Sequence, residues 1–154
     1  MNSENYELIE HTADIRIRVK ACDLKELFKN TALAMFDIMA QKKSKIKNLR
    51  QKEWRIRQEL WRKKSKIEIK QKADNLEELF VNWLNELLSL SATKELIFTD
   101  FKLDKLDEKN LEATVVGKDI KNYKVNTEIK AATYHELKLE ESKSGWQAEV
   151  IFDV

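Results

Sequence analysis

The stretch Ile15-Arg-Ile-Arg-Val-Lys-Ala21, which leads into Leu24-Lys-Glu-Leu-Phe28, is echoed at an offset of 52 residues by Ile67-Glu-Ile-Lys-Gln-Lys-Ala73 and Leu76-Glu-Glu-Leu-Phe80. In the first part of each copy apolar and charged residues alternate, which predicts a strand with one buried face. In the second part apolar residues recur at spacings of three and four, which predicts an amphipathic helix. The sequence therefore predicts two β-α units, over residues 15–28 and 67–80.

The starts of both helices are marked by capping residues. Asp23 and Asn75 each precede a helix and are followed three positions later by a glutamate. Their side-chain oxygens can accept hydrogen bonds from amides that have no partner inside the helix. Apolar residues then continue along one face, namely Leu24, Leu27, Phe28, Thr31, Met35, Ile38 and Met39 in the first helix and Leu76, Leu79, Phe80, Trp83, Leu84, Leu87 and Leu88 in the second.

The C-terminal half of the chain is strand-like. Residues 101–106 and 111–116 are joined by a short polar loop, which predicts a hairpin. Residues 129–139 and 146–154 flank Ser144-Gly145, where glycine can adopt a positive φ without cost. Together these elements predict an α+β fold, with two amphipathic helices packed on one side of a largely antiparallel sheet.

Length and composition narrow the class of protein. The 154 residues fit a single domain over 1–154, and 42% hydrophobic content is too high for a disordered chain. Cys22 is the only cysteine, so an internal disulfide is excluded. No segment resembles a signal peptide or a membrane span, and we expect a cytoplasmic protein without membrane contact.

Positive charge is concentrated in one part of the chain. Residues 41–72 hold 14 basic and 3 acidic side chains, a balance of +11, although the whole chain carries only +2. We expect a basic, hairpin-like insertion at about 41–66. Its lysines and arginines, with Trp54 and Trp61, could contact RNA phosphates and bases, or they could form a solvated hairpin packed on the core.

Three oxygen-bearing residues at opposite ends of the chain are candidate metal ligands. Asp14 is on the polar face of the first strand, while Asp153 and the terminal carboxylate of Val154 end the last strand. If these strands are neighbours, three negative charges converge, and a cation would relieve their repulsion. Oxygen ligands favour calcium or magnesium. The alternative is that these carboxylates are simply solvated.

The histidines do not indicate catalysis. Strand parity places His135 on one face with Ile129, Ala131 and Leu137, which predicts a buried, hydrogen-bonded histidine. No serine or cysteine occupies a nucleophile-like turn, and no glycine-rich phosphate loop is present. We therefore expect a protein that is not an enzyme.

Four motifs carry a resemblance to a known family: Glu10-His-Thr-Ala-Asp-Ile15, Trp83-Leu-Asn-Glu-Leu-Leu88, Ile129-Lys-Ala-Ala-Thr-Tyr-His135 and Gly145-Trp-Gln-Ala-Glu-Val-Ile-Phe-Asp-Val154. In order and spacing the chain resembles the archease family almost from end to end, outside the basic stretch. The resemblance implies a small protein cofactor that activates the GTP-dependent tRNA-splicing RNA ligase. Such a cofactor promotes guanylylation and multiple turnover of the ligase but does not join RNA itself.

For the site, the resemblance implies that Asp14, Asp153 and Val154 hold a calcium ion, or magnesium or another divalent cation. Two residues depart from or add to the family pattern. Arg16 stands where the family commonly has glycine, and Glu149 adds an acidic group on the face of Asp153. Two other functions remain open from the sequence: a chaperone-like modulator of a tRNA methyltransferase, and a stand-alone RNA-binding module.

Overall fold

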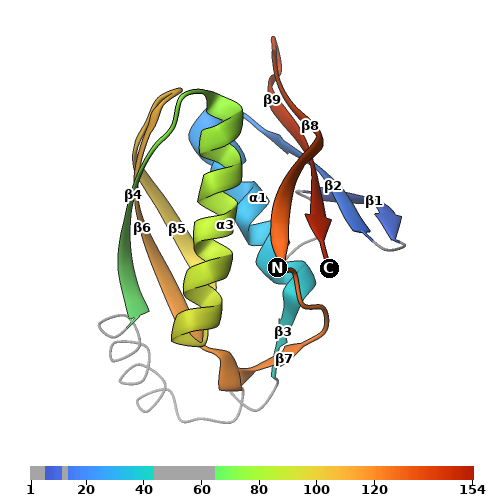
Figure 1. Ribbon diagram of the computed structural model, residues 1–154, viewed down its shortest axis with the longest axis vertical. Coiled ribbons are helices and arrows are strands. Elements are labelled where there is room, and N and C mark those ends of the chain that lie inside the picture. Colours follow the sequence, from blue (N-terminus) through green and yellow to red (C-terminus); the bar gives the residue numbers. More distant parts are fainter. Residues whose placement is uncertain (1–5, 12–13, 44–64) are drawn as a thin grey trace.

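The structure is a computed structural model that describes residues 6–11, 14–43 and 65–154. Two strand-to-helix blocks are followed by a run of strands (Figure 1). The elements in chain order are β1 (Tyr6–His11), β2 (Asp14–Ala21), α1 (Leu24–Met39), β3 (Ala40–Lys42), β4 (Lys66–Lys72), α3 (Leu76–Lys94), β5 (Leu96–Leu106), β6 (Asn110–Asp119), the 3-10 turn η3 (Ile120–Asn122), β7 (Tyr123–Val125), β8 (Ala131–Ser142) and β9 (Gly145–Asp153). Neither α1 nor α3 has the length and apolar character that a membrane-spanning helix needs.

Both helices begin where the capping pattern predicts. α1 follows Asp23, whose side chain accepts a hydrogen bond from the Glu26 amide at 2.8 Å. Glu26 in turn accepts from the Cys22 amide at 3.2 Å. α3 follows Asn75, whose side chain accepts from the Glu78 amide at 2.8 Å. These bonds satisfy amides that the helices themselves leave without partners, which confirms the predicted starts.

The strands form three antiparallel sheets. A four-stranded sheet has the order β1-β2-β9-β8, a three-stranded sheet the order β4-β6-β5, and β3 pairs with β7. α1 contacts β2 and β5, and α3 contacts β8 and β5, so each helix touches both larger sheets. Figure 1 shows the two helices between these sheets. The α+β class is confirmed, and the two β-α units contribute strands to different sheets.

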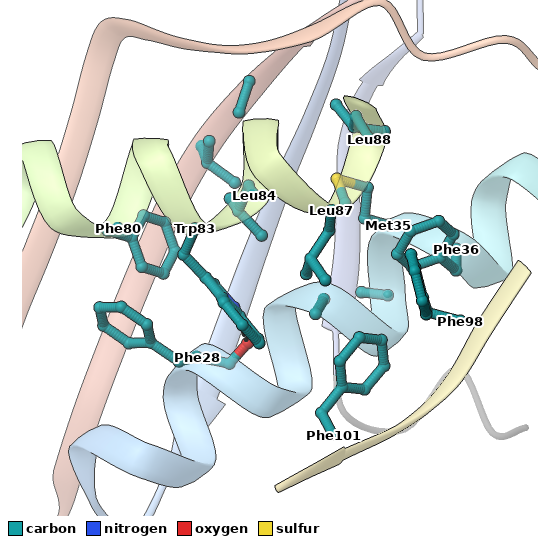
Figure 2. Packing of buried hydrophobic residues seen from close by; sticks show 14 of the residues in the cluster. Phe28, Met35, Phe36, Phe80, Trp83, Leu84, Leu87, Leu88, Phe98 and Phe101 are labelled. Carbon is teal, nitrogen blue, oxygen red and sulfur yellow. Dashed lines mark hydrogen bonds between the residues drawn. The ribbon is translucent and has the colours of Figure 1, made fainter. Parts of the chain in front are cut away.

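Aromatic side chains from the two β-α units meet in the core (Figure 2). Phe28 and Phe80, which occupy equivalent positions in the echo, pack edge to face with ring centroids 5.1 Å apart. Trp83 is fully buried, and its indole Nε1 donates a hydrogen bond to the Phe28 carbonyl oxygen at 3.0 Å. Trp83 also contacts Phe101 of β5. The apolar helix faces that the spacing predicts therefore pack against each other and hold the two β-α units together.

Both predicted hairpins are present. Between β5 and β6 the Asp107 amide donates to the Asn110 carbonyl oxygen at 3.0 Å. Between β8 and β9 Gly145 has a φ of 127°, in the region that favours glycine. A Cβ atom at this position would lie 2.2 Å from the Ala21 carbonyl oxygen, so the close approach of β2 also requires glycine. The β8–β9 turn thus depends on a single residue type.

The predicted burial of His135 is wrong, because its side chain is 73% exposed. The pairing of β8 with β9 shifts between Thr133 and Lys138, and Glu136 within this shift has a left-handed φ of 51°. Alternation of faces holds only in a regular strand, and extra residues on one strand break it. The irregularity therefore turns His135 outward.

The basic insertion predicted at about 41–66 lies largely outside the described residues, as do Trp54 and Trp61. Its two ends are described. At the start, β3 pairs with β7, and the Lys43 amide donates to the Asn122 carbonyl oxygen at 2.9 Å. At the end, β4 pairs with β6. The hairpin itself stays a prediction.

Candidate metal centre

Asp14 and Asp153 are direct partners across two neighbouring strands. β2 and β9 run antiparallel and side by side, and their unbroken register places Asp14 opposite Asp153. Directly opposed residues in such a pair have Cβ atoms about 4.5–5.5 Å apart. The next pair, Ile15 with Phe152, is buried, so a slip of one residue would expose both apolar side chains. Burial of the apolar pairs thus holds the two exposed carboxylates together.

The backbone around Asp153 is held from both sides. Asp153 also pairs with Ala131 of β8, and its carbonyl oxygen accepts a hydrogen bond from the Lys130 amide at 2.8 Å. Ile129, just before, is buried in the core. Val154 follows Asp153, is half-buried and packs its side chain against the core. Val154 is therefore tethered beside the two carboxylates.

Elsewhere on the outer face of this sheet, opposite charges alternate across the strands. Arg18 pairs with Glu7 at 3.2 Å and with Glu149 at 2.9 Å, and Glu149 also pairs with Lys138 at 3.6 Å. The pKa of Glu149 is held below its ordinary value, chiefly because Arg18 donates a hydrogen bond to its carboxylate. Glu149 does share the face of Asp153, but its charge is already balanced by two cations.

The carboxylate pair lacks such partners. Within the described part of the chain, neither Asp14 nor Asp153 forms an ion pair or a side-chain hydrogen bond. Like charges placed directly opposite each other destabilise a pair of strands. Arg16, the nearest cationic residue along β2, forms its ion pair with Glu136 of β8 instead. Among the described residues, the register thus leaves two adjacent negative charges without a neutralising side chain.

The donor chemistry fits a hard cation. The described residues contain no group of three or more His, Cys, Asp or Glu side chains arranged to hold a metal. Two carboxylates with a main-chain or terminal oxygen of Val154 make a partial oxygen set, and calcium and magnesium commonly complete such sets with water. Such a set of oxygen donors favours these cations over zinc and copper.

One cavity lined by described residues lies apart from the carboxylates. Its volume is about 580 Å³, and its lining comes from α1, β3, β5, β6 and β7 without Asp14 or Asp153. The carboxylate pair lies instead among the exposed side chains at one end of the two central strands, β2 and β9, where a bound cation would be accessible to another macromolecule.

Sequence reasoning missed one residue that positions this site. Asn85 of α3 donates from Nδ2 to the Ala132 carbonyl oxygen at 3.1 Å, and its Oδ1 accepts from the Ala132 amide at 2.7 Å. The side chain thus pairs with the open edge of β8 as a peptide group would, next to Ala131 and Asp153. Its signals in the sequence are its place in the motif Trp83-Leu-Asn-Glu-Leu-Leu88 and its position as a polar residue beside the apolar stripe of the helix, which is common on surfaces.

Comparison with known proteins agrees with the resemblance in the motifs. The sequence model described as the archease protein family matches residues 6–154. A protein archease of Methanosarcina barkeri is 34% identical over an alignment of 157 residues, covering 98% of this chain and 97% of that protein. One of Pyrococcus furiosus is 35% identical over 156 residues, covering 97% and 98%.

Solved structures agree in fold. A solution structure of a Methanobacterium thermoautotrophicum protein matches with a TM-score of 0.63 at 26% identity, covering 98% of this chain and 99% of that one. The crystal structure of a Thermotoga maritima protein, described as an archease and possible chaperone, matches with a TM-score of 0.59 at 23% identity, covering 96% of each chain. On the whole-length sequence match, this chain belongs to the archease family.

Proposed function

We propose that this protein is a metal-binding protein cofactor that activates the GTP-dependent tRNA-splicing RNA ligase and promotes its guanylylation and multiple turnover. Family membership supports the role of an accessory protein. The observation that carries the metal-dependent part is the placement of Asp14 directly opposite Asp153, with no neutralising partner among the described residues.

Asp14, Asp153 and Val154 are the residues that would hold the cation, with calcium as the first candidate and magnesium as the alternative. A bound divalent cation would supply positive charge at the otherwise acidic ends of β2 and β9, where a phosphate group of a transferred nucleotide could be bound. The chain's own part is to hold the two carboxylates in fixed register on these strands. This exposed end of the sheet is then the surface that meets the ligase.

Metal binding is tested by titrating calcium chloride into the protein in a calorimeter. Asp14→Asn and Asp153→Asn should each weaken binding by about tenfold or more, because each removes a charged ligand. Glu141→Gln is the matched control, since it removes one exposed negative charge from the same sheet. If all three substitutions weaken calcium binding equally, binding depends only on the net charge of the protein, and Asp14 and Asp153 are not specific ligands.

Ligase activation is tested by multiple-turnover ligation of RNA ends that carry a 3′-phosphate or cyclic phosphate. The parent protein should raise the number of turnovers per ligase, and Asp14→Ala should abolish that increase. An Asp14→Ala variant as active as the parent would remove the metal from the mechanism. No effect of the parent on ligation, together with altered specificity of a tRNA methyltransferase, would instead favour the chaperone-like function.

We also propose that the basic stretch 41–72 contacts RNA phosphates. Most of it lies outside the described residues, but Lys66, in its described part, lines a surface hollow of about 280 Å³ together with Lys29 and Lys102. Asp100 is also in this lining and lowers its net charge. RNA binding through these groups should weaken steeply with salt, and replacing two of the lysines with glutamine should reduce the slope of log K against log[salt] by about 1–2.

A further inference from the structure

One arginine lies within reach of the carboxylate pair. Arg16 is two residues from Asp14 on β2, so the two side chains point to the same face of the sheet. Residues two apart along a strand are separated by about 6–7 Å. An extended arginine side chain is long enough to place its guanidinium beside Asp14 and Asp153, where it would pair with both carboxylates and balance one of their two negative charges.

Instead, Arg16 is directed across the sheet. Its guanidinium pairs with Glu136 of β8. Ile151 of β9 is the cross-strand partner of Arg16 and lies between the two strands. Although Ile151 shares the polar outer face, it is only 6% exposed. Arg16 lies directly opposite Ile151, and long cationic side chains commonly cover apolar surface with their aliphatic part.

Glu136 owes its position to the irregular part of β8. The register shift between Thr133 and Lys138 inserts extra residues, and Glu136 takes up a left-handed φ of 51° there. Such a conformation is uncommon for glutamate and persists where the surrounding structure imposes it. The shift therefore brings a carboxylate to the level of Arg16.

The pair with Glu136 does not use all the donors of Arg16. The Nε atom of Arg16 is buried and has no hydrogen-bond partner among the described residues. A second carboxylate acceptor would satisfy more of these donors, so Asp14 and Asp153 compete with Glu136 for the guanidinium. Arg18 also has a buried Nε without a partner among the described residues, but its other two guanidinium nitrogens pair with two carboxylates, those of Glu7 and Glu149.

We propose that Glu136 is a positioning residue: by holding Arg16 on β8, it keeps Asp14 and Asp153 available for a divalent cation. This inference rests on the proposed function, because it concerns the same metal centre. Without Glu136, the guanidinium turns along β2 to the carboxylate pair and competes with the cation.

A double-mutant cycle tests the proposal, with calcium chloride titrated into the full chain. Glu136→Gln should raise the Kd for calcium about two- to fivefold, the range expected for one partly exposed ion pair. In the Arg16→Gln background the same substitution should change the Kd by less than about twofold, because no guanidinium is left to compete. Glu141→Gln is the charge-matched control, and thermal unfolding checks that each variant folds.

The outcomes separate this inference from the proposed function. Calcium binding by the parent, with the same effect of Glu136→Gln in both backgrounds, overturns the positioning role and leaves the metal centre intact. Absence of calcium binding by the parent overturns the metal centre and this inference with it. Calcium binding by the parent that Glu136→Gln weakens about two- to fivefold, and that Glu136→Gln no longer weakens in the Arg16→Gln background, supports both.

Discussion

Replacement of Asn85 by alanine should loosen the attachment of α3 to the four-stranded sheet. The Asn85 side chain makes two hydrogen bonds to Ala132, at 2.7 and 3.1 Å, on the edge of β8 that faces away from β9. An amide side chain offers both a donor and an acceptor, so it can match both backbone groups of one residue. Alanine would leave the amide and carbonyl of Ala132 without partners.

The size of the effect follows from these two groups. A buried donor or acceptor that loses its partner costs about 1–3 kcal/mol, and this contact is partly buried. The higher helix propensity of alanine offsets about 0.5 kcal/mol. We therefore expect Asn85→Ala to lower the free energy of unfolding by about 2–4 kcal/mol, which for a domain of this length is a fall in Tm of roughly 5–12 °C.

Urea denaturation followed by tryptophan fluorescence measures the loss. Asn82→Ala is the matched control, because Asn82 is half-buried in the same helix and its side chain makes no hydrogen bond with the described residues. Asn82→Ala should leave the free energy of unfolding unchanged or raise it slightly. If the free energies of unfolding of Asn85→Ala and Asn82→Ala differ by less than about 0.5 kcal/mol, which is the size of the gain in helix propensity, the edge of β8 does not depend on Asn85.

Three further substitutions test other parts of the fold. Asn75→Ala removes the cap of α3 and should cost about 1 kcal/mol in urea denaturation. Gly145→Ala should cost about 2 kcal/mol or more in the same assay, because its φ of 127° and the approach of the Ala21 carbonyl oxygen exclude a Cβ atom. The pKa of Glu149 is lowered by Arg18, so the stability it contributes is present above the ordinary glutamate pKa and is lost as pH falls through the lowered value. Glu149→Gln should therefore flatten the fall in Tm on acidification, measured by calorimetry from neutral to acidic pH.

Local chemistry was sufficient to predict the elements of this fold. The starts of α1 and α3 follow from Asp23 and Asn75, because a cap acts on amides within one turn. The buried face of β2 follows from alternation, since side chains in a regular strand point to opposite faces in turn. The same rule failed for His135, because the extra residues in β8 break the alternation without any glycine or proline to mark them.

Only part of the candidate site could be predicted from the sequence. Asp14 could be placed on an exposed face from parity alone, but its position opposite Asp153 depends on the pairing of β2 with β9. Glu136 and Asn85 carried no distinctive local signal, although one pairs with Arg16 and the other with Ala132.

By itself, then, the sequence determined the α+β class, the two β-α units, the capped helices and the exposure of Asp14. Tertiary structure alone decided that the strands divide among separate sheets, that β2 lies beside β9, and that Arg16 turns to Glu136. The physical reason is how far along the sequence each interaction acts. Caps and alternation act between residues a few positions apart, whereas strand pairing joins segments more than a hundred residues apart through burial of a shared core.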